Sequence, residues 1–162
     1  MKGIDPLIST FLIIVITIAA IALVLKVGTP ATGRAQEILL LEEGKNNLAN
    51  IDTAVKNVLQ EGQGSTRVLT LIVSGGVYSI DPASDNITFV MDSRSQIVGV
   101  GITQVENDIT IAGSQGSVRL TLSYNSLDVV NGGNFVKGTN TITINNGGYN
   151  LTSNKQTISV KP

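Results

Sequence analysis

The chain has 162 residues, enough for one modest domain and an additional segment, and its formal net charge is −1. Its Lys and Arg residues do not cluster into a basic face, which argues against nucleic-acid binding. The chain contains no Cys and no His, so disulfides, thiolate or imidazole metal ligands and the commonest general base are all missing. We therefore expect no catalytic residues, no metal site, no cofactor and no enzymatic activity.

The N-terminal region is a long apolar segment. Between Leu7 and Leu25 only Ser9, Thr10 and Thr17 are polar. An α-helix of this length, rising about 1.5 Å per residue, would come close to the hydrocarbon thickness of a bilayer. Because apolar residues occupy every side of it, such a helix must be surrounded by lipid or by other helices.

Residues 34–61 predict a second, amphipathic helical region. Its apolar residues recur at intervals of three, four or seven and form one stripe, which we expect to pack on the following domain. The stripe consists of Ile38, Leu41, Leu48, Ile51, Val55 and Val58. Two glycines in the stretch EGQGS (61–65) end the helix. The two helical regions are compatible with one long helix that has a weak point at Gly28-Thr29-Pro30, where Pro lacks a backbone donor.

The remaining residues, 66–162, predict strands throughout. The β-prone runs, separated by Gly, Asn and Asp, are 67–73, 77–80, 86–91, 96–102, 107–113, 117–124, 134–148 and 156–160. Their spacing favours an antiparallel sandwich or barrel, and the absence of an interrupting helix argues against a parallel α/β architecture. We expect an α+β fold, in which a long hydrophobic N-terminal helix precedes an all-β, antiparallel, sandwich-like head.

Side-chain patterns within these runs indicate which residues form the core of the head. Ile142 and Ile144 lie on one face of their strand, and Thr141 and Thr143 lie on the other. Four aromatic residues are expected to pack in the core or on a strand face rather than to form an adhesive site. They are Tyr78, Phe89, Tyr124 and Phe135.

The first 25 residues also contain a motif. In KGIDPLISTFLIIVITIAAIAL, Lys2 and Gly3 precede Ile4, Pro6, Leu7, Ile8, Ser9 and the apolar run 12–18. This pattern resembles the amino terminus of archaeal type IV pilins. The resemblance implies a class III signal peptide, in which a prepilin peptidase removes residues 1–3 by cleaving after Gly3 and the mature chain begins at Ile4. It also implies a helical stem at residues 4–61, made of a hydrophobic assembly or membrane segment (4–25) and an amphipathic helix (31–61).

The resemblance implies a structural function. The chain would be a subunit of a type IV pilus-like filament that polymerises through its N-terminal helix and supports adhesion at the cell surface. Its partners would be its own copies, the prepilin peptidase and the pilus assembly machinery, and it would reside in the cytoplasmic membrane before assembly. The residues expected to carry assembly are Ile4, Leu7, Phe11, Leu12, Ile14, Val15, Ile18, Ile21 and Leu25.

Two other interpretations of the apolar segment stay open. A secretory signal peptide would be removed entirely and would leave a soluble β domain. A permanent single-span anchor would hold an extracellular β domain at the membrane, as a minor pilin or an assembly component that does not form filaments itself.

Three short motifs in the head have two interpretations each. The sequons at Asn86-Ile87-Thr88 and Asn150-Leu151-Thr152 are either N-glycosylation sites, as the pilin resemblance implies for a glycoprotein, or chance matches. Asp81 and Asp85 flank a turn, where carboxylates could in principle bind calcium, but their spacing does not match an EF-hand loop and favours a plain turn.

Overall fold

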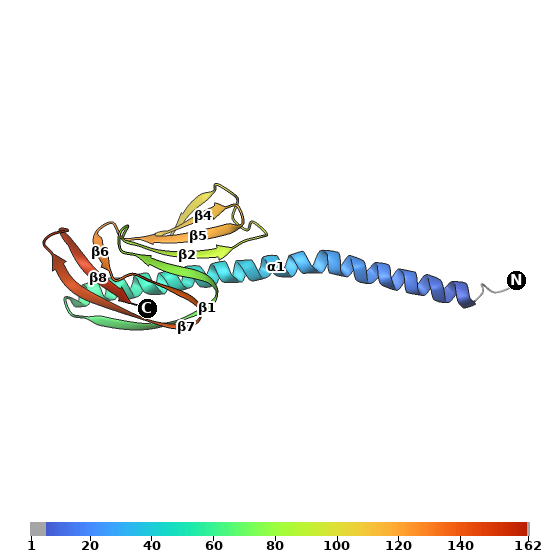
Figure 1. Cartoon of the computed structure of the whole chain (residues 1–162), viewed down its shortest axis with the longest axis horizontal. Coiled ribbons are helices and arrows are strands. Elements are labelled where there is room, and N and C mark those ends of the chain that lie inside the picture. Colours follow the sequence, from blue (N-terminus) through green and yellow to red (C-terminus); the bar gives the residue numbers. More distant parts are fainter. Residues whose placement is uncertain (1–5, 162) are drawn as a thin grey trace. The chain divides into compact units, whose positions relative to one another are not determined.

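The computed structural model describes residues 6–161 and consists of one long helix followed by eight strands (Figure 1). The elements are α1 (Pro6–Glu61), β1 (Thr66–Asp81), β2 (Asn86–Asp92), β3 (Thr103–Glu106), β4 (Ile109–Ser114), β5 (Ser117–Ser123), β6 (Leu127–Val130), β7 (Gly133–Asn150) and β8 (Lys155–Lys161). The predicted α+β layout is confirmed. The expected two-sheet sandwich is not confirmed, because all eight strands belong to one hydrogen-bonded sheet.

Helix α1 passes through Gly28-Thr29-Pro30 without a break. Near this point the Thr32 hydroxyl donates a hydrogen bond to the Gly28 carbonyl oxygen at 3.3 Å. The chain divides into two compact units, one that ends at Gln36 and one that begins at Glu37. The second half of α1 therefore belongs to the same unit as the sheet, which we call the globular unit (residues 37–161). The first unit contains the apolar segment (residues 8–25).

In the globular unit the sheet curves around the second half of α1 (Figure 1). The strand order is β3-β4-β5-β2-β1-β7-β8-β6. All neighbouring strands are antiparallel except β6 and β8, which run parallel. The register of β1 shifts between Val73 and Val77, and that of β7 shifts between Asn146 and Gly148. Such irregularities bend long strands, which allows β1 and β7 to follow the curvature of the sheet.

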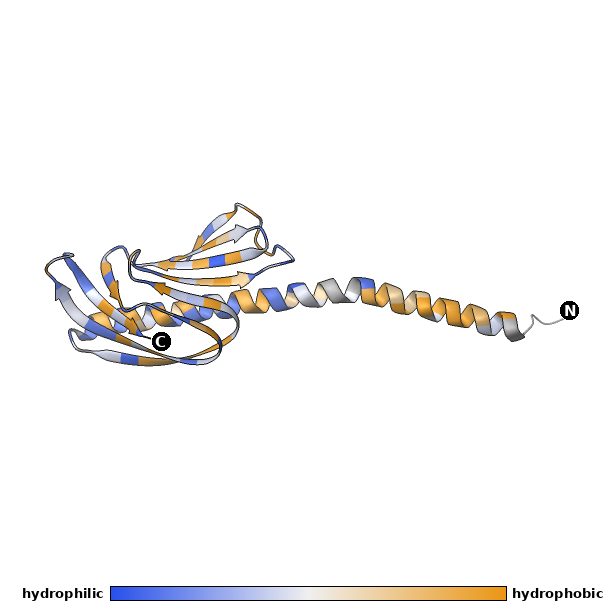
Figure 2. Ribbon diagram, in the orientation of Figure 1, coloured by the Kyte–Doolittle hydropathy of each residue, from blue (hydrophilic) through white to orange (hydrophobic). Residues whose placement is uncertain are grey.

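The core of the globular unit lies between this part of α1 and the concave face of the sheet. Leu48, Ile51, Val55 and Val58 are completely buried, as the apolar stripe predicts. Ile38, at the start of the stripe, is a correction, because it is 45% exposed. Figure 2 shows the alternation of apolar and polar residues along the strands. The alternation predicted for β7 is confirmed: Ile142 and Ile144 are buried, whereas Thr141 is exposed and Thr143 partly exposed.

Three of the four aromatic residues form a row across neighbouring strands. Tyr78 of β1 is opposite Phe89 of β2 and opposite Phe135 of β7. The Tyr78 ring centroid lies 4.5 Å from that of Phe89 and 4.7 Å from that of Phe135. These contacts confirm the prediction that the aromatic residues pack in the core, and Tyr124 is buried as well.

A buried amide from α1 meets this aromatic row where β1 bends. The Asn47 side-chain amide donates hydrogen bonds to the Ile72 carbonyl oxygen at 3.0 Å and to the Tyr78 hydroxyl oxygen at 3.1 Å. Burial raises the pKa of Tyr78 to about 12, so this hydroxyl stays neutral at physiological pH. Asn47 therefore fixes the position of α1 relative to the bend in β1.

Two strand predictions are corrected. Residues 96–102 were expected to form a strand, but they form a loop, in which Gln96 and Gly101 have positive φ angles. The loop begins at a turn in which the backbone N–H groups of Arg94 and Ser95 donate hydrogen bonds to the Glu37 carboxylate. The start of the loop is therefore bound to α1 and does not pair with a neighbouring strand. Conversely, β3 and β6, each of only four residues, lie in none of the predicted runs.

Candidate assembly surface and modification sites

The apolar segment of α1 exposes large side chains on every side. Four consecutive residues, Phe11, Leu12, Ile13 and Ile14, are between 51% and 69% exposed. Successive residues of an α-helix point about 100° apart, so these four cover the whole circumference. Figure 2 shows the same apolar character along the first part of the helix. This helix is long and apolar enough to cross a membrane by its length and composition.

The structure places most of the predicted assembly residues on this surface. The exposed members are Phe11, Leu12, Ile14, Val15, Ile18, Ile21 and Leu25. Equally exposed residues that the sequence-based set omitted are Ile8, Ile13, Ile16, Leu23 and Val24. Their signal was present in the sequence, since apolar residues on all sides imply that the whole circumference is a contact surface. The processing residues Gly3 and Ile4 lie outside the described residues, and Leu7 belongs to α1.

The polar side chains of the apolar segment do not prevent its burial. The Thr17 hydroxyl donates a hydrogen bond to the Ile13 carbonyl oxygen at 2.7 Å. A hydroxyl satisfied within its own helix adds little to the penalty of removing that helix from water. By contrast, transferring each large apolar side chain from water to a packed environment contributes about 1.5–3 kcal/mol. The segment thus has a strong driving force to enter lipid or a bundle of helices.

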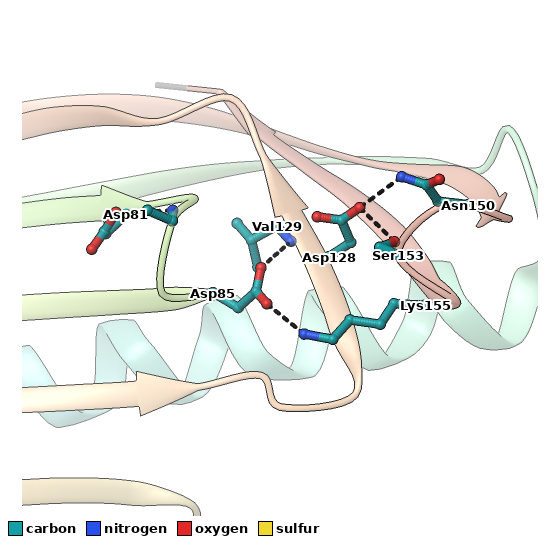
Figure 3. Close-up of polar contacts among 8 residues, drawn as sticks. Asp81, Asp85, Asp128, Val129, Asn150, Ser153 and Lys155 are labelled. Atoms are coloured by element: carbon teal, nitrogen blue, oxygen red, sulfur yellow. Dashed lines mark hydrogen bonds and ion pairs between the residues drawn. The ribbon is translucent and has the colours of Figure 1, made fainter.

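The two sequons lie in different environments. Asn86 begins β2, and its side chain is partly exposed on the convex face of the sheet. It makes no side-chain hydrogen bond within the part of the chain that the structure describes. Asn150 ends β7, and both ends of its amide are engaged: Nδ2 donates to Asp128 at 2.9 Å, and Oδ1 accepts from the Thr152 backbone N–H at 2.9 Å (Figure 3). Asn86 is therefore the sequon whose amide is available without loss of a contact.

The two aspartates predicted to flank a turn have different structural roles. Asp81 accepts hydrogen bonds from the Ala83 N–H and the Ser84 hydroxyl, as in an ordinary turn. Asp85 accepts from the Val129 N–H at 2.9 Å and pairs with the Lys155 ammonium at 2.7 Å (Figure 3). Within residues 6–161 no group of three potential ligands is arranged to hold a metal ion. The Asp81 carboxylate stabilises the turn, and the Asp85 carboxylate holds strand β6 in place.

No protein-family model matches this chain, and comparisons with curated proteins and with solved structures also found no match. Three properties of the chain itself bear on its function: the apolar segment, the globular unit and the sequence of the first 25 residues.

Proposed function

We propose that this protein is the structural subunit of a type IV pilus-like surface filament and that it polymerises through its apolar N-terminal segment. The observation that carries this proposal is the exposure of large apolar side chains around the full circumference of residues 8–25. A soluble domain with its own core would gain no stability from such a helix, because its apolar side chains are unfavourable in water. A filament buries it among copies of itself, and the globular units then coat the outside and mediate adhesion.

The two units of the chain fit this division of labour. The globular unit already has a complete core, to which the second half of α1 contributes, so its fold does not require the apolar segment. Lateral packing of identical helices through a heterologous contact generates an open helical polymer when the rotation between neighbouring copies does not close a ring. Ala19, Ala20 and Ala22 lower the bulk of the segment locally and would let neighbouring helices approach closely.

In this proposal the chain is a glycosylated, membrane-inserted precursor before it is an extracellular filament. The type IV pilin-like start of the sequence supports cleavage after Gly3 and archaeal origin. The free amide of Asn86 supports that position as the better glycan acceptor of the two sequons. The head, which the sequence predicted to be sandwich-like, forms a single curved sheet around α1 in the described residues.

One alternative has a specific observation in its favour. Because α1 is long and apolar enough to span a bilayer, the chain could be a permanent single-span anchor for an extracellular β domain. This would describe a minor pilin or an assembly component. In that case the segment contacts lipid in the mature protein and never packs against copies of itself.

The two functions are distinguished by shearing the producing cells and examining the released material by electron microscopy, intact mass and amino-terminal sequencing. The filament function predicts fibres made of a chain that starts at Ile4 and retains the apolar segment. An uncut chain confined to the membrane fraction would support the anchor, and a soluble chain that starts near Ala31 would indicate a secretory signal.

A matched pair of substitutions adds a second test. Leu12→Arg places a charge in the apolar segment and should abolish filaments. Leu151→Arg places the same charge at an exposed position of the globular unit, 88% accessible, and keeps the sequon intact, so filaments should persist. Filament formation by Leu12→Arg at the native yield would contradict the proposed role of the segment.

A further inference from the structure

Strand β1 is paired on only one side along its first half. Residues 66–73 pair with β7, whereas the pairing of β1 with β2 begins at Val77. Among the described residues, 6–161, no strand pairs with the other edge of residues 66–73. The sheet thus has an open edge in its middle, in addition to the edges formed by its outermost strands β3 and β6.

The backbone groups of Val68 and Thr70 point toward this open edge. The Ile72 carbonyl oxygen accepts a hydrogen bond from Asn47 of α1, so the polar backbone groups of Ile72 face away from β7. In an antiparallel strand this direction alternates along the chain, so Val68 and Thr70 share it. Residue Ser65, of opposite parity, instead accepts a bond from the Asn146 N–H of the β7 side. Asn47 therefore caps the Ile72 carbonyl at one end of the open edge, and among the described residues no contact caps the backbone groups of Val68 and Thr70.

A groove runs beside these two residues. Its walls are Asn50, Thr53 and Asn57 of α1 and residues 67–71 of β1, and its volume is about 370 Å³. The helix side of the groove carries amides and a hydroxyl, which can both donate and accept hydrogen bonds. Such a surface suits a polypeptide backbone better than an apolar ligand.

Strand β3, which is an outermost strand of the sheet, supplies a second uncapped edge. All four of its residues are exposed, and Val105 is 73% exposed. The two-residue turn Asn107-Asp108, with positive φ at both positions, makes Glu106 and Ile109 the hydrogen-bonded pair next to it. The backbone groups of Thr103 and Val105 therefore point away from β4. The Lys45–Glu106 ion pair at 2.8 Å holds the strand in place.

The remaining edge strand is protected. The Val129 N–H of β6 donates to the Asp85 carboxylate, which blocks the approach of another strand. Among the described residues, β1 and β3 thus present edges that can accept a partner, as does the side of β7 that faces away from β1 over residues 133–142. The β1 edge lies beside a groove walled by α1, whereas β3 is an outermost strand whose four residues are all exposed and whose Glu106 pairs with Lys45 of α1.

We propose that strand β3 of one copy pairs with the open edge of β1 in a neighbouring copy, next to Val68 and Thr70. This inference rests on the proposed filament, which would bring identical globular units side by side. We match these two edges because the β1 edge lies beside a groove walled by α1 and β3 is a short strand whose four residues are all exposed. Because the contact joins two different surfaces, it can repeat from copy to copy, and with the helical arrangement of the proposed filament it would extend along that filament.

Introduced cysteines test this contact directly, since the native chain contains no thiol. In sheared filaments of the double variant Thr70→Cys/Val105→Cys, a short bis-maleimide should link successive copies into a ladder of covalent multimers. Each single variant should yield no ladder. Intact filaments of the double variant without a ladder would overturn the inference alone. Covalent dimers from Thr70→Cys alone would also overturn it, because they require contact between two β1 edges. Absence of filaments from the native chain would overturn the proposed function and the inference together.

A pair of proline variants provides an independent readout. Thr70→Pro removes an N–H from the open edge but no hydrogen bond between β1 and β7. Thr141→Pro is the matched control, because Thr141 lies opposite Thr70, its N–H points away from β1, and the pairing of β7 with β8 extends only as far as Thr143. Thr70→Pro filaments should dissociate at a lower temperature than Thr141→Pro filaments. Equal dissociation temperatures would contradict the proposed strand pairing.

Discussion

The ring of Phe89 occupies the space that a side chain at Gly44 would need. A Cβ atom placed on Gly44 would lie 2.5 Å from two carbon atoms of that ring. Gly76 of β1 meets the same ring from another strand, with an equally short distance for its own Cβ. Phe89 is therefore enclosed by two glycines, one on α1 and one at the bend of β1, and also contacts Tyr78. This explains why a helix interior retains a glycine that lowers its intrinsic stability.

We predict that Gly44→Ala destabilises the globular unit by about 1–3 kcal/mol, the usual range for overpacking a core. The loss should appear as a lower urea midpoint in unfolding followed by tyrosine fluorescence. Gly33→Ala is the control, because a Cβ at that helical position has nothing within 4 Å. It should not lower the midpoint, because it adds no clash and removes a glycine from a helix interior. Equal midpoints for Gly44→Ala and the native chain would show that the Phe89 ring moves away without penalty.

The sequence predicted those parts of the fold that depend on local periodicity. The spacing of Leu48, Ile51 and Val55 identified the buried face of α1, and the alternation around Ile142 identified the inner face of β7. These patterns reflect which side of one element faces the core. They carry no information on whether the strands form one sheet or two.

What the sequence did not reveal depends on contacts between distant residues. The loop at 96–102 has the composition of a strand, yet the turn before it is bound to Glu37, more than fifty positions earlier. The open edge of β1 follows from the bend near Gly76, which moves the start of pairing with β2 to Val77. The apolar circumference of residues 8–25, by contrast, could be predicted from the sequence over its whole length, because it does not depend on contacts with residues distant in the chain.

A second buried asparagine supports the end of α1. The Asn146 side chain is fully buried; Nδ2 donates to the Val58 carbonyl oxygen at 3.0 Å, and Oδ1 accepts from the Gly148 N–H at 2.9 Å. The carbonyl of Val58 is one of the last four of the helix, which have no partner within it. The Ser65 hydroxyl donates to the same oxygen at 2.6 Å. Asn146 thus joins the end of α1 to the irregular part of β7.

We predict that Asn146→Ala lowers the free energy of unfolding by about 2–3 kcal/mol, since a buried N–H at Gly148 loses its acceptor. Asn145→Ala is the matched control. The side-chain amide of Asn145 donates to the Ser65 carbonyl oxygen and the Thr66 hydroxyl oxygen, but it is partly exposed, so water can take over these hydrogen bonds in the variant. Equilibrium urea unfolding of both variants measures the difference. A loss of the same size in both would mean that the buried position of Asn146 has no special role.

Acid should weaken the attachment of the loop that follows β2. Burial by itself would raise the pKa of Glu37, but hydrogen bonds from the Ser95 and Arg94 N–H groups and the Ser93 hydroxyl outweigh it and hold the pKa below its ordinary value of 4.5. A carboxyl with a lowered pKa in the folded state stabilises that state at pH values above its unfolded pKa. This contribution is lost as the pH falls through the folded pKa.

We therefore predict that the stability difference between the native chain and Glu37→Gln is largest near neutral pH and shrinks as the pH falls below the ordinary Glu pKa of 4.5 and through the lowered pKa of the folded state. Urea midpoints measured at a series of pH values would show two curves that converge toward acid. The protection factors of the Arg94 and Ser95 amides, which correct for the intrinsic pH dependence of hydrogen exchange, should fall in parallel. Curves that stay parallel down to acid would show that the Glu37 contacts do not contribute to stability.

The two sequons should respond differently to removal of their asparagine, even without a glycan. In protein made by a host that adds no N-glycans, Asn150→Gln should lower the free energy of unfolding by about 1–2 kcal/mol, because the bonds to Asp128 and Thr152 are displaced. Asn86→Gln should leave it unchanged within about 0.5 kcal/mol, as for an ordinary surface substitution. Thr152→Val is the control, since it removes the sequon but retains the Asn150 amide. If Thr152→Val destabilises the protein as much as Asn150→Gln, the hydroxyl of Thr152, and not the Asn150 amide, holds the end of β7.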